Sequence, residues 1–186
     1  MPHDLAIHTR RLLLRPLQPG DVDALFGIFS DPDVMRYWST PPWASPEPGR
    51  EMVARDQAAG PDADHLRLGL VRRDDDTLIG TCTLFDHIRQ SRRAEIGYAL
   101  GRAAWGQGYM HEALGALLDH GFDAWNLNRV EADIDPRNAP SARALERLGF
   151  QREGFLRERW IVAGEVSDTA LYGLLRSDWR ATRSGG

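Results

Sequence analysis

Apolar residues recur along the chain at two spacings, and these spacings predict where strands and helices lie. A short apolar run from Arg10 to Arg15, ended by Pro16, is typical of a first strand. Apolar positions from Val22 to Phe29 then recur at helical spacing, which predicts a helix that stops near Asp31-Pro32. Asp33 to Trp38 is expected to form another short helical turn with exposed aromatic side chains.

A proline-rich loop and a further helix are expected next. Ser39 to Pro48 contains four prolines, so its backbone freedom is restricted. Glu47 to Ala59 can form a helix. Tyr37, Trp38 and Trp43 could line the mouth of a substrate site, or they could pack this loop onto the core, and the sequence leaves both interpretations open.

From Leu66 the apolar spacing becomes that of strands. Leu66 to Arg72 and Thr77 to Phe85 flank a turn of one arginine and three aspartates, so they predict an antiparallel hairpin. Consecutive carboxylates in a turn are usually solvated, and we expect no metal there. Ala94 to Leu100 is the next expected strand, and Gly97 inside it marks a bulge or a close approach of backbone.

The second half of the chain predicts two helices and three strands. Apolar residues from Met110 to Trp125 fall on one helical face. The elements expected after that helix are a strand at Arg129 to Asp135, a helix at Ala139 to Leu148, and a hairpin of strands at Phe155 to Val162 and Ser167 to Leu175. No repeat or linker divides the chain, so residues 1–186 are expected to form a single α/β domain with flexible termini at about 1–8 and 180–186.

The composition limits the class of protein. With 186 residues, 42% hydrophobic and 27% charged, the chain has the length and composition of one soluble globular domain. No apolar run approaches the roughly 20 residues of a membrane span, and the N-terminal residues lack the features of a secretion signal. The single cysteine, Cys82, has no partner for an internal disulfide, which fits a reducing, cytoplasmic location.

The charge pattern excludes several classes of partner and of binding site. The formal net charge is −4 and no segment is a basic block, so neither nucleic acid nor a membrane is expected as a partner. All 23 basic residues are arginine. Because lysine is absent, the chain has neither a Schiff-base lysine nor a lysine-dependent P-loop.

A glycine-rich turn, Gly106-Gln107-Gly108, separates the Ala94 to Leu100 strand from the long helix. Such a turn aims several unpaired backbone N–H groups at one point, and the helix dipole adds partial positive charge, so we expect it to bind phosphate. A dinucleotide fingerprint is disfavoured, because the turn comes mid-chain and no third glycine follows at Glu112.

A second motif selects the phosphate-bearing ligand. The segment Asn138-Ala139-Pro140-Ser141-Ala142-Arg143-Ala144-Leu145-Glu146-Arg147-Leu148-Gly149-Phe150, taken with Trp105-Gly106-Gln107-Gly108-Tyr109, resembles the GNAT acyltransferase superfamily. The resemblance is strongest with the ribosomal-protein N-terminal acetyltransferase (RimJ/RimL-like) branch, which Thr9 to Leu17, Ser30 to Val34 and Leu171 to Leu175 also resemble. It implies a GNAT fold: a mixed, mostly antiparallel α/β sheet of about seven strands with splayed central strands, flanked by about four helices.

The resemblance implies acetyl-CoA as co-substrate and no metal. The pyrophosphate would bind the backbone amides from Gly106 to Met110, although Trp105 stands where the family usually has glutamine or arginine, and Met110 where glycine or alanine is usual. The positions implied in cofactor binding are Tyr98, Ala99 and Leu100 through their backbone, Trp105, Gly106, Gln107, Gly108, Tyr109, Met110, Asn138, Ser141, Arg143 and Arg147.

Four of these positions on the short helix have a simpler structural interpretation as well. Asn138 and Ser141 match residues that contact the pantetheine arm, but Asn138 could be a plain helix N-cap and Ser141 an ordinary polar residue of the first turn. Arg143 and Arg147 could meet the 3′-phosphate of the cofactor or form a solvated helix face.

The resemblance also implies direct attack of an amine on the thioester, without an acyl-enzyme. Glu95 is the candidate base, directly or through water, and the alternative is a glutamate that is exposed or ion-paired to a neighbouring arginine. Ser141 is the candidate acid for the departing thiolate, with Tyr98 as the alternative. A backbone N–H near Gly97 or Tyr98 would stabilise the oxyanion.

The expected function is therefore N-acetyl transfer from acetyl-CoA to an amine acceptor, either a peptide N-terminus or a small amine. The alternatives are an acetyltransferase for small molecules or aminoglycosides, and a non-catalytic sensor or scaffold that binds acetyl-CoA. A homodimer is possible, because dimers are common in the branch that the chain resembles.

Overall fold

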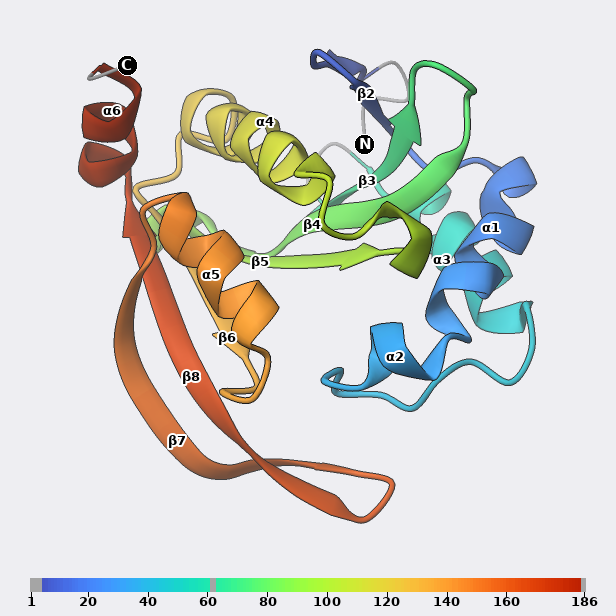
Figure 1. The fold of residues 1–186 in the computed structure, drawn as a ribbon. Coiled ribbons are helices and arrows are strands. Elements are labelled where there is room, and N and C mark those ends of the chain that lie inside the picture. Colours follow the sequence, from blue (N-terminus) through green and yellow to red (C-terminus); the bar gives the residue numbers. More distant parts are fainter. Residues whose placement is uncertain (1–4, 61–62, 185–186) are drawn as a thin grey trace.

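The computed structural model of the protein describes residues 5–60 and 63–184. These residues form an eight-stranded sheet in the order β1-β2-β3-β4-β5-β6-β8-β7 (Figure 1). The strands are β1 (Ile7–His8), β2 (Leu12–Arg15), β3 (Leu66–Arg72), β4 (Leu78–Ile88), β5 (Arg93–Leu100), β6 (Arg129–Ile134), β7 (Gln151–Val162) and β8 (Glu165–Leu175). The helices are α1 (Val22–Phe29), α2 (Pro32–Met35), α3 (Glu47–Ala58), α4 (Tyr109–Asp123), α5 (Ala139–Arg147) and α6 (Arg176–Ser184).

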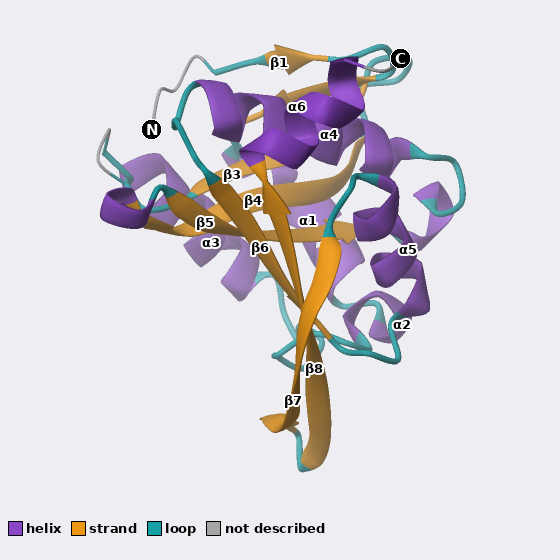
Figure 2. Ribbon diagram, turned by 90° about the vertical axis from the view of Figure 1, so that its left-hand side faces the viewer, coloured by secondary structure: helices purple, strands orange, loops and turns teal. Residues whose placement is uncertain are grey.

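Helices cover both faces of the sheet. Helices α4, α5 and α6 lie on one face and α1 and α3 on the other, while the β7–β8 hairpin projects away from the body (Figure 2). Alternation along the strands supplies both apolar layers. In β5, for example, Ala94 and Ile96 join the cluster under α4, and Ala99 joins the cluster over α1 and α3.

The centre of the sheet splits, as the resemblance implies. Strands β5 and β6 are the sheet's parallel pair, and their register covers only Arg93↔Arg129, Ala94↔Val130 and Glu95↔Glu131. Beyond Glu95, β5 stays bonded to β4 and β6 stays bonded to β8, so the two strands follow different neighbours and diverge (Figure 1). The split leaves one edge of each strand free.

The structure confirms the expected fold class, with eight strands and six helices among the described residues where about seven and about four were expected. Strand β7 begins at Gln151 rather than Phe155, because it pairs with β8 along an exposed edge where no apolar pattern marks its start. Helix α6 was not predicted. Its sequence is polar apart from Trp179, which is 5% exposed and donates from Nε1 to Asp119 at 2.9 Å. Tertiary contacts of this kind leave no periodic signal in the sequence.

The termini were expected to be flexible at about 1–8 and 180–186. Residues 1–4 and 185–186 lie outside the described residues. In the described part, Ile7–His8 pairs with β2 and α6 runs to Ser184. No helix of that part is long and apolar enough to cross a membrane.

Candidate active site

The glycine turn at the start of α4 is built to bind an anion. Gly106 and Gly108 have φ of +73° and +77°, which glycine adopts without strain. Across the described chain, no protein acceptor receives a hydrogen bond from the backbone N–H groups of Gly106 to His111. A Cβ on Gly106 would have no atom within 4 Å, so the turn borders open space on that side. The residues therefore fit a phosphate-bearing group.

The side chains of this turn contact other parts of the protein, so the groups left to bind a ligand are its backbone N–H groups. The Gln107 amide donates to the carbonyl of Ala103 at 3.0 Å, Tyr109 is 8% exposed, and Met110 packs partly buried against the core under α4. The Met110 side chain, where the family usually has glycine or alanine, is thus accommodated by the core. Trp105 is 45% exposed, and its Nε1 donates to the carbonyl of Leu100 at 2.7 Å.

Two hydroxyl groups meet beside the splayed strands. Asn138 is the N-cap of α5, and its Oδ1 accepts from the backbone N–H of Ser141 at 3.2 Å. This places the Ser141 Oγ 2.7 Å from the Tyr98 hydroxyl of β5. Burial raises the pKa of Tyr98 to about 12, so its hydroxyl stays protonated at neutral pH. The structure thus brings together the two candidate acids.

Glu95 lies on the opposite face of β5 from Tyr98, because successive strand residues point to opposite faces. It is the last residue of β5 that pairs with β6, so its carboxylate stands where the strands part. Burial raises the pKa of Glu95, and the negative charges of Asp86, Glu131 and Asp133 raise it further.

Two of the carboxylates near Glu95, those of Glu131 and Asp133, are paired to arginines, whereas Glu95 has no hydrogen bond or ion pair with any described residue. Glu131 accepts from Arg93 at 2.6 Å and from Arg129 at 2.7 Å. Asp133 accepts from Arg159 at 3.0 Å. The charge of Arg93 partly opposes the rise in the Glu95 pKa, but no cation forms an ion pair with this carboxylate in the described chain. A half-buried carboxylate with a raised pKa and no ion pair is suited to accept a proton.

The free edge of β5 presents backbone groups to the gap between the strands. The N–H of Gly101 donates to Ile79 of β4 at 2.8 Å, and backbone groups alternate along an antiparallel strand. Ala99 therefore turns its N–H and C=O toward β4, while those of Tyr98 and Leu100 face the gap. This changes the expectation for Ala99, whose backbone pairs within the sheet and whose side chain is core. It also favours the Tyr98 N–H over that of Gly97 as the oxyanion donor.

The three aromatic residues that could line a substrate mouth have different surroundings in the structure. The Trp43 ring stacks on Phe29 with centroids 4.6 Å apart, and Trp38 meets Phe29 edge-on at 5.4 Å. Both tryptophans thus pack the loop onto the core, which was the alternative interpretation. Tyr37 instead lies under the guanidinium of Arg137, 5.9 Å from its ring centre, at the turn before α5.

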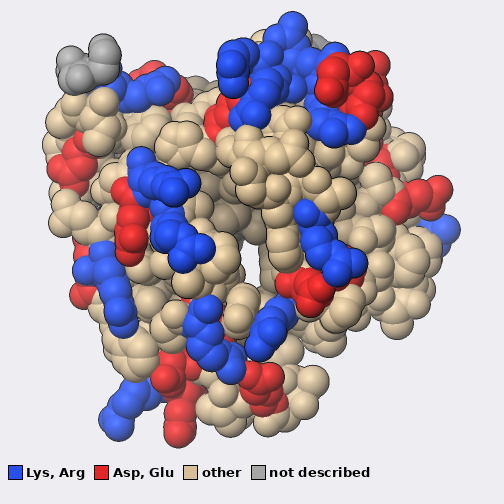
Figure 3. Space-filling model, viewed as in Figure 1, with Lys and Arg blue, Asp and Glu red and all other residues tan. Residues whose placement is uncertain are grey.

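The molecule is open at the end of the splay. Figure 3 shows an opening at the centre of this face, between the side that carries α5 and the side that carries α2, with basic side chains around it. Arg143 and Arg147 are exposed on α5, and neither pairs with an acidic group of the described chain. No cluster of three or more histidine, cysteine or acidic side chains placed to hold a metal exists among the described residues.

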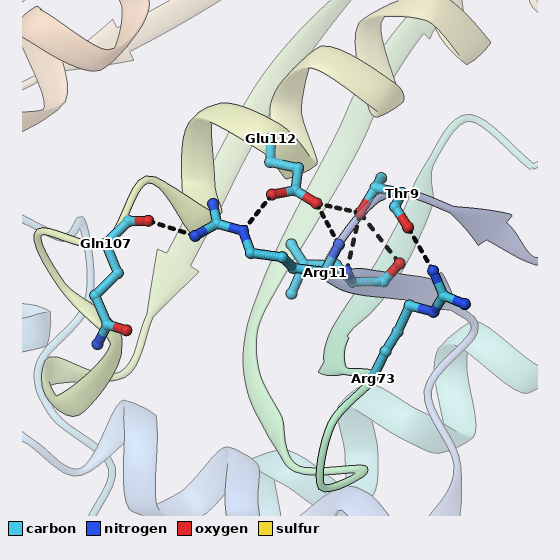
Figure 4. A network of polar contacts seen from close by, with 6 residues as sticks. Thr9, Arg11, Arg73, Gln107 and Glu112 are labelled. Carbon is cyan, nitrogen blue, oxygen red and sulfur yellow. Dashed lines mark hydrogen bonds and ion pairs between the residues drawn. The ribbon is translucent and has the colours of Figure 1, made fainter.

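Sequence reasoning missed two residues beside the glycine turn, Arg11 and Glu112. Glu112 lies in the first turn of α4, and its Oε2 accepts from the Arg11 Nε at 2.7 Å (Figure 4). The two residues are 101 positions apart, so no local pattern could have paired them.

Comparison with known proteins agrees with this geometry. Residues 11–151 match the model of the acetyltransferase (GNAT) domain. The chain is 36% identical over 173 residues to the uncharacterised N-acetyltransferase p20 of Bacillus licheniformis, covering 93% of this chain and 97% of the relative. It is 32% identical over 116 residues to the ribosomal protein uS5-alanine N-acetyltransferase of Escherichia coli, covering 62% and 60% of the two chains. The chain therefore belongs to the GNAT acetyltransferase family, an assignment that confirms the resemblance found in its motifs.

A solved structure supports the fold separately. Spermidine N-acetyltransferase from Vibrio cholerae, in complex with CoA and spermine, superposes with a TM-score of 0.82 over 92% of this chain and 99% of the other, at 23% identity. At this identity the likeness concerns the fold. The chain is thus a GNAT N-acetyltransferase, a family that uses acetyl-CoA.

Proposed function

We propose that the chain transfers the acetyl group of acetyl-CoA directly to an amine, with the thioester held in the gap between β5 and β6. One observation carries this proposal. The unpaired Glu95 carboxylate stands on one face of β5, and the hydroxyl pair of Tyr98 and Ser141 stands on the other, where the strands part. A proton acceptor and a proton donor thus flank the place where the reaction would occur.

Each group has a defined task in this proposal. Glu95 takes a proton from the acceptor's ammonium group, directly or through water, and the freed nitrogen bonds to the thioester carbonyl carbon. The Tyr98 N–H donates to the oxygen on which charge develops. As the C–S bond breaks, the hydroxyl pair of Tyr98 and Ser141 gives a proton to the thiolate and regains one from the acylated nitrogen, so the products are the amide, the free thiol of CoA and a protonated Glu95. Holding amine and thioester in line can supply ~7–11 kcal/mol.

A covalent acyl-enzyme is not part of the proposal. The protein's single thiol, Cys82, is fully buried in β4, and burial raises its pKa far above the usual range. A buried, protonated thiol is a poor nucleophile. Direct transfer needs no nucleophilic side chain.

We place the cofactor along the same gap. Its pyrophosphate would accept from the amides of Gly106 to Met110, and its pantetheine arm would pair with the Tyr98 C=O and the Leu100 N–H, which face the gap. Asn138 uses its side-chain oxygen as the N-cap of α5, which leaves its amide nitrogen to donate to the arm. The 3′-phosphate would lie near Arg143 and Arg147.

For the acceptor, we propose the α-amine of a peptide N-terminus, and a small polyamine as the second candidate. The first rests on the uS5-alanine acetyltransferase, which aligns with 62% of this chain. The second rests on the acidic surroundings of Glu95, where Asp86, Glu131 and Asp133 favour a cation. Aminoglycosides, which are also polycations, stay as an alternative.

Release of free thiol from acetyl-CoA tests this function. The panel contains alanyl peptides with free and with blocked N-termini, spermidine, and an aminoglycoside. We expect thiol release only with a free amine, and little release with any acceptor for Glu95→Gln. If the protein binds CoA tightly by calorimetry but releases no thiol with any amine, the sensor alternative is correct and the enzymatic proposal is wrong.

Two further expectations stay predictions. Cytoplasmic location is one. A homodimer is the other, and the exposed apolar side chains of the β7–β8 hairpin, such as Trp160 and Ile161, provide surface for it. Light scattering on the purified protein would measure the assembly, and a single monomer mass at high concentration would contradict a dimer.

A further inference from the structure

A polar network ties the N-terminal segment to the glycine turn (Figure 4). The Glu112 Oε1 accepts from the Thr9 hydroxyl at 2.6 Å and from the Arg11 backbone N–H at 2.7 Å. Its Oε2 accepts from the Arg11 Nε at 2.7 Å. The same guanidinium donates from Nη1 to the backbone carbonyl of Gln107 at 2.8 Å and lies 4.4 Å from the centre of the Tyr109 ring. Arg11 therefore spans from the helix to the middle of the turn.

Every part of the Glu112 carboxylate is engaged in this network. Burial alone would raise the pKa of Glu112, but the hydrogen bonds from Thr9 and Arg11 and the charge of Arg11 outweigh it and hold the pKa below its usual range. The group is therefore ionised at neutral pH. A bare carboxylate in the first turn of α4 would repel an anion at that helix end, and the Arg11 guanidinium neutralises it.

The bond to Gln107 fixes the orientation of one peptide group. In a trans peptide, the C=O of one residue and the N–H of the next point in opposite directions. Because the Gln107 carbonyl points at Arg11, the N–H of Gly108 points away from it, to the other side of the turn. Gly108 has φ of +77°, and a Cβ there would lie 3.5 Å from the Arg11 Nη2. A glycine turn without such a tether could rotate this peptide group.

We infer that Arg11, held by Glu112, is a positioning residue that keeps the Gly108 N–H directed at the cofactor's pyrophosphate. The inference rests on the proposed binding of the pyrophosphate at this turn. Arg11 contacts the Gln107 carbonyl, on the side of the turn opposite the Gly108 N–H. It therefore acts on the cofactor only through the orientation of the backbone. Its removal is expected to weaken cofactor binding without altering the chemical step.

Arg11→Gln tests the inference, with Arg10→Gln as the matched control. Both changes remove one positive charge from neighbouring positions, but Arg10 is exposed and forms none of the hydrogen bonds of the network. Calorimetry with CoA measures binding in the absence of turnover. Losing a charge-assisted hydrogen bond that orients one amide predicts about tenfold weaker CoA binding for Arg11→Gln and no change for Arg10→Gln.

Two further measurements separate positioning from a general structural effect. Acetyl-pantetheine carries the thioester but no pyrophosphate, so its kcat/KM should be the same in Arg11→Gln and wild type, while the KM for acetyl-CoA rises and kcat stays. Arg11→Lys keeps the charge but cannot hold Glu112 and Gln107 together in a fork, so it should weaken CoA binding to an intermediate extent. The NMR signal of the Gly108 amide should move in Arg11→Gln and not in Arg10→Gln.

The outcomes distinguish the inference from the proposed site. Equal CoA affinity in Arg11→Gln and Arg10→Gln would overturn the inference, as would an equal loss with acetyl-pantetheine. If Gly106→Ala also leaves CoA binding unchanged, the pyrophosphate lies elsewhere and the proposed site itself is wrong. If Arg11→Gln unfolds below the assay temperature, the CoA affinities of Arg11→Lys and Glu112→Gln are compared with that of Arg10→Gln instead.

Discussion

The hydroxyl groups of Tyr98 and Ser141 lie 2.7 Å apart, and this contact joins the free edge of β5 to the first turn of α5. If the pair delivers one proton, its members act as a unit. We then expect Tyr98→Phe and Ser141→Ala each to lower kcat by about 10²-fold, and the double variant to lose little more than the worse single one. Steady-state kinetics of the three variants measures this.

A buried tyrosine of β8, whose hydroxyl bonds to Glu146 and not to Ser141, provides the control. The Tyr172 hydroxyl donates to Glu146 at 3.3 Å, so Tyr172→Phe removes the same atom from a core residue of β8. Its kcat should stay near wild type. Fully multiplicative losses in the Tyr98→Phe and Ser141→Ala cycle would show that the two hydroxyls act independently, contrary to the proposal.

The glycine turn gives a second prediction. A methyl group on Gly106 projects into the open space beside the unpaired amides, so Gly106→Ala should weaken CoA binding at least tenfold by calorimetry, which corresponds to about 1.4 kcal/mol. Gly164→Ala is the control, because Gly164 also has positive φ, at +85°, with open space around it, but lies in the β7–β8 turn. Both variants carry the same backbone strain of about 1–2 kcal/mol. Equal CoA affinities would contradict the proposed cradle.

The arginines of α5 are expected to recognise the 3′-phosphate. Since exposed ion pairs contribute about 0.2–1 kcal/mol each, the double change Arg143→Gln and Arg147→Gln should weaken acetyl-CoA binding about two- to thirtyfold. The affinity for 3′-dephospho-CoA should not change. Arg157→Gln, on the exposed β7 strand, is the control. A similar loss for both cofactors would mean that these arginines act on something other than that phosphate.

We expect substitutions of the aromatic residues around α2 to affect either the stability of the fold or the binding of the acceptor, but not both. Trp43 stacks on Phe29 and lies 3.1 Å from the Cβ position of Gly49, so Trp43→Ala should lower the free energy of unfolding by about 1–3 kcal/mol. Tyr37→Ala should leave that free energy unchanged and raise the KM of the acceptor. Urea denaturation and acceptor titrations test the two halves. If Trp43→Ala leaves the free energy of unfolding unchanged and raises the KM of the acceptor, Trp43 contributes to the substrate site and not to the core.

Much of the fold follows from local signals. The seven expected strands and the long helix α4 arise from apolar periodicity, and the glycines of the turn mark where the backbone must adopt positive φ. Helix α6 and strand β1 escaped prediction for different reasons. Helix α6 is held by a contact between Trp179 and Asp119, which lie far apart in sequence. Strand β1 has two residues, Ile7–His8, too few for apolar alternation to mark it.

The site was predictable in its parts and not in its arrangement. Strand alternation alone separates Glu95 from Tyr98, but the contact of Tyr98 with Ser141 spans 43 residues and depends on how α5 packs beside the splay. The exclusion of Ala99 from the gap depends on which edge of β5 bonds to β4. The Arg11–Glu112 pair depends on the docking of β2 against α4. These contacts depend on how elements that are far apart in the sequence pack together, and no local pattern in a single sequence predicts that packing.

Glu95 as the base predicts a specific pH dependence. Its active form is the ionised carboxylate, and its pKa is raised, so kcat/KM should fall on the acid side at a pH above about 4.3, where an ordinary glutamate titrates. Because the negative charge of Asp86 contributes to the rise, Asp86→Asn should lower the pKa of Glu95 and move the acid limb to lower pH. Asp86 has φ of +51°, which asparagine also tolerates.

The most direct test of the account is the pH–rate profile of kcat/KM for wild type, Asp86→Asn and Glu95→Gln, measured with two acceptors whose amines have different pKa values. If Glu95 is the base, the acid limb is the same for both acceptors, shifts to lower pH in Asp86→Asn, and disappears in Glu95→Gln, while CoA affinity stays near wild type. An acid limb that follows the pKa of the acceptor amine and persists in Glu95→Gln would contradict that role for Glu95.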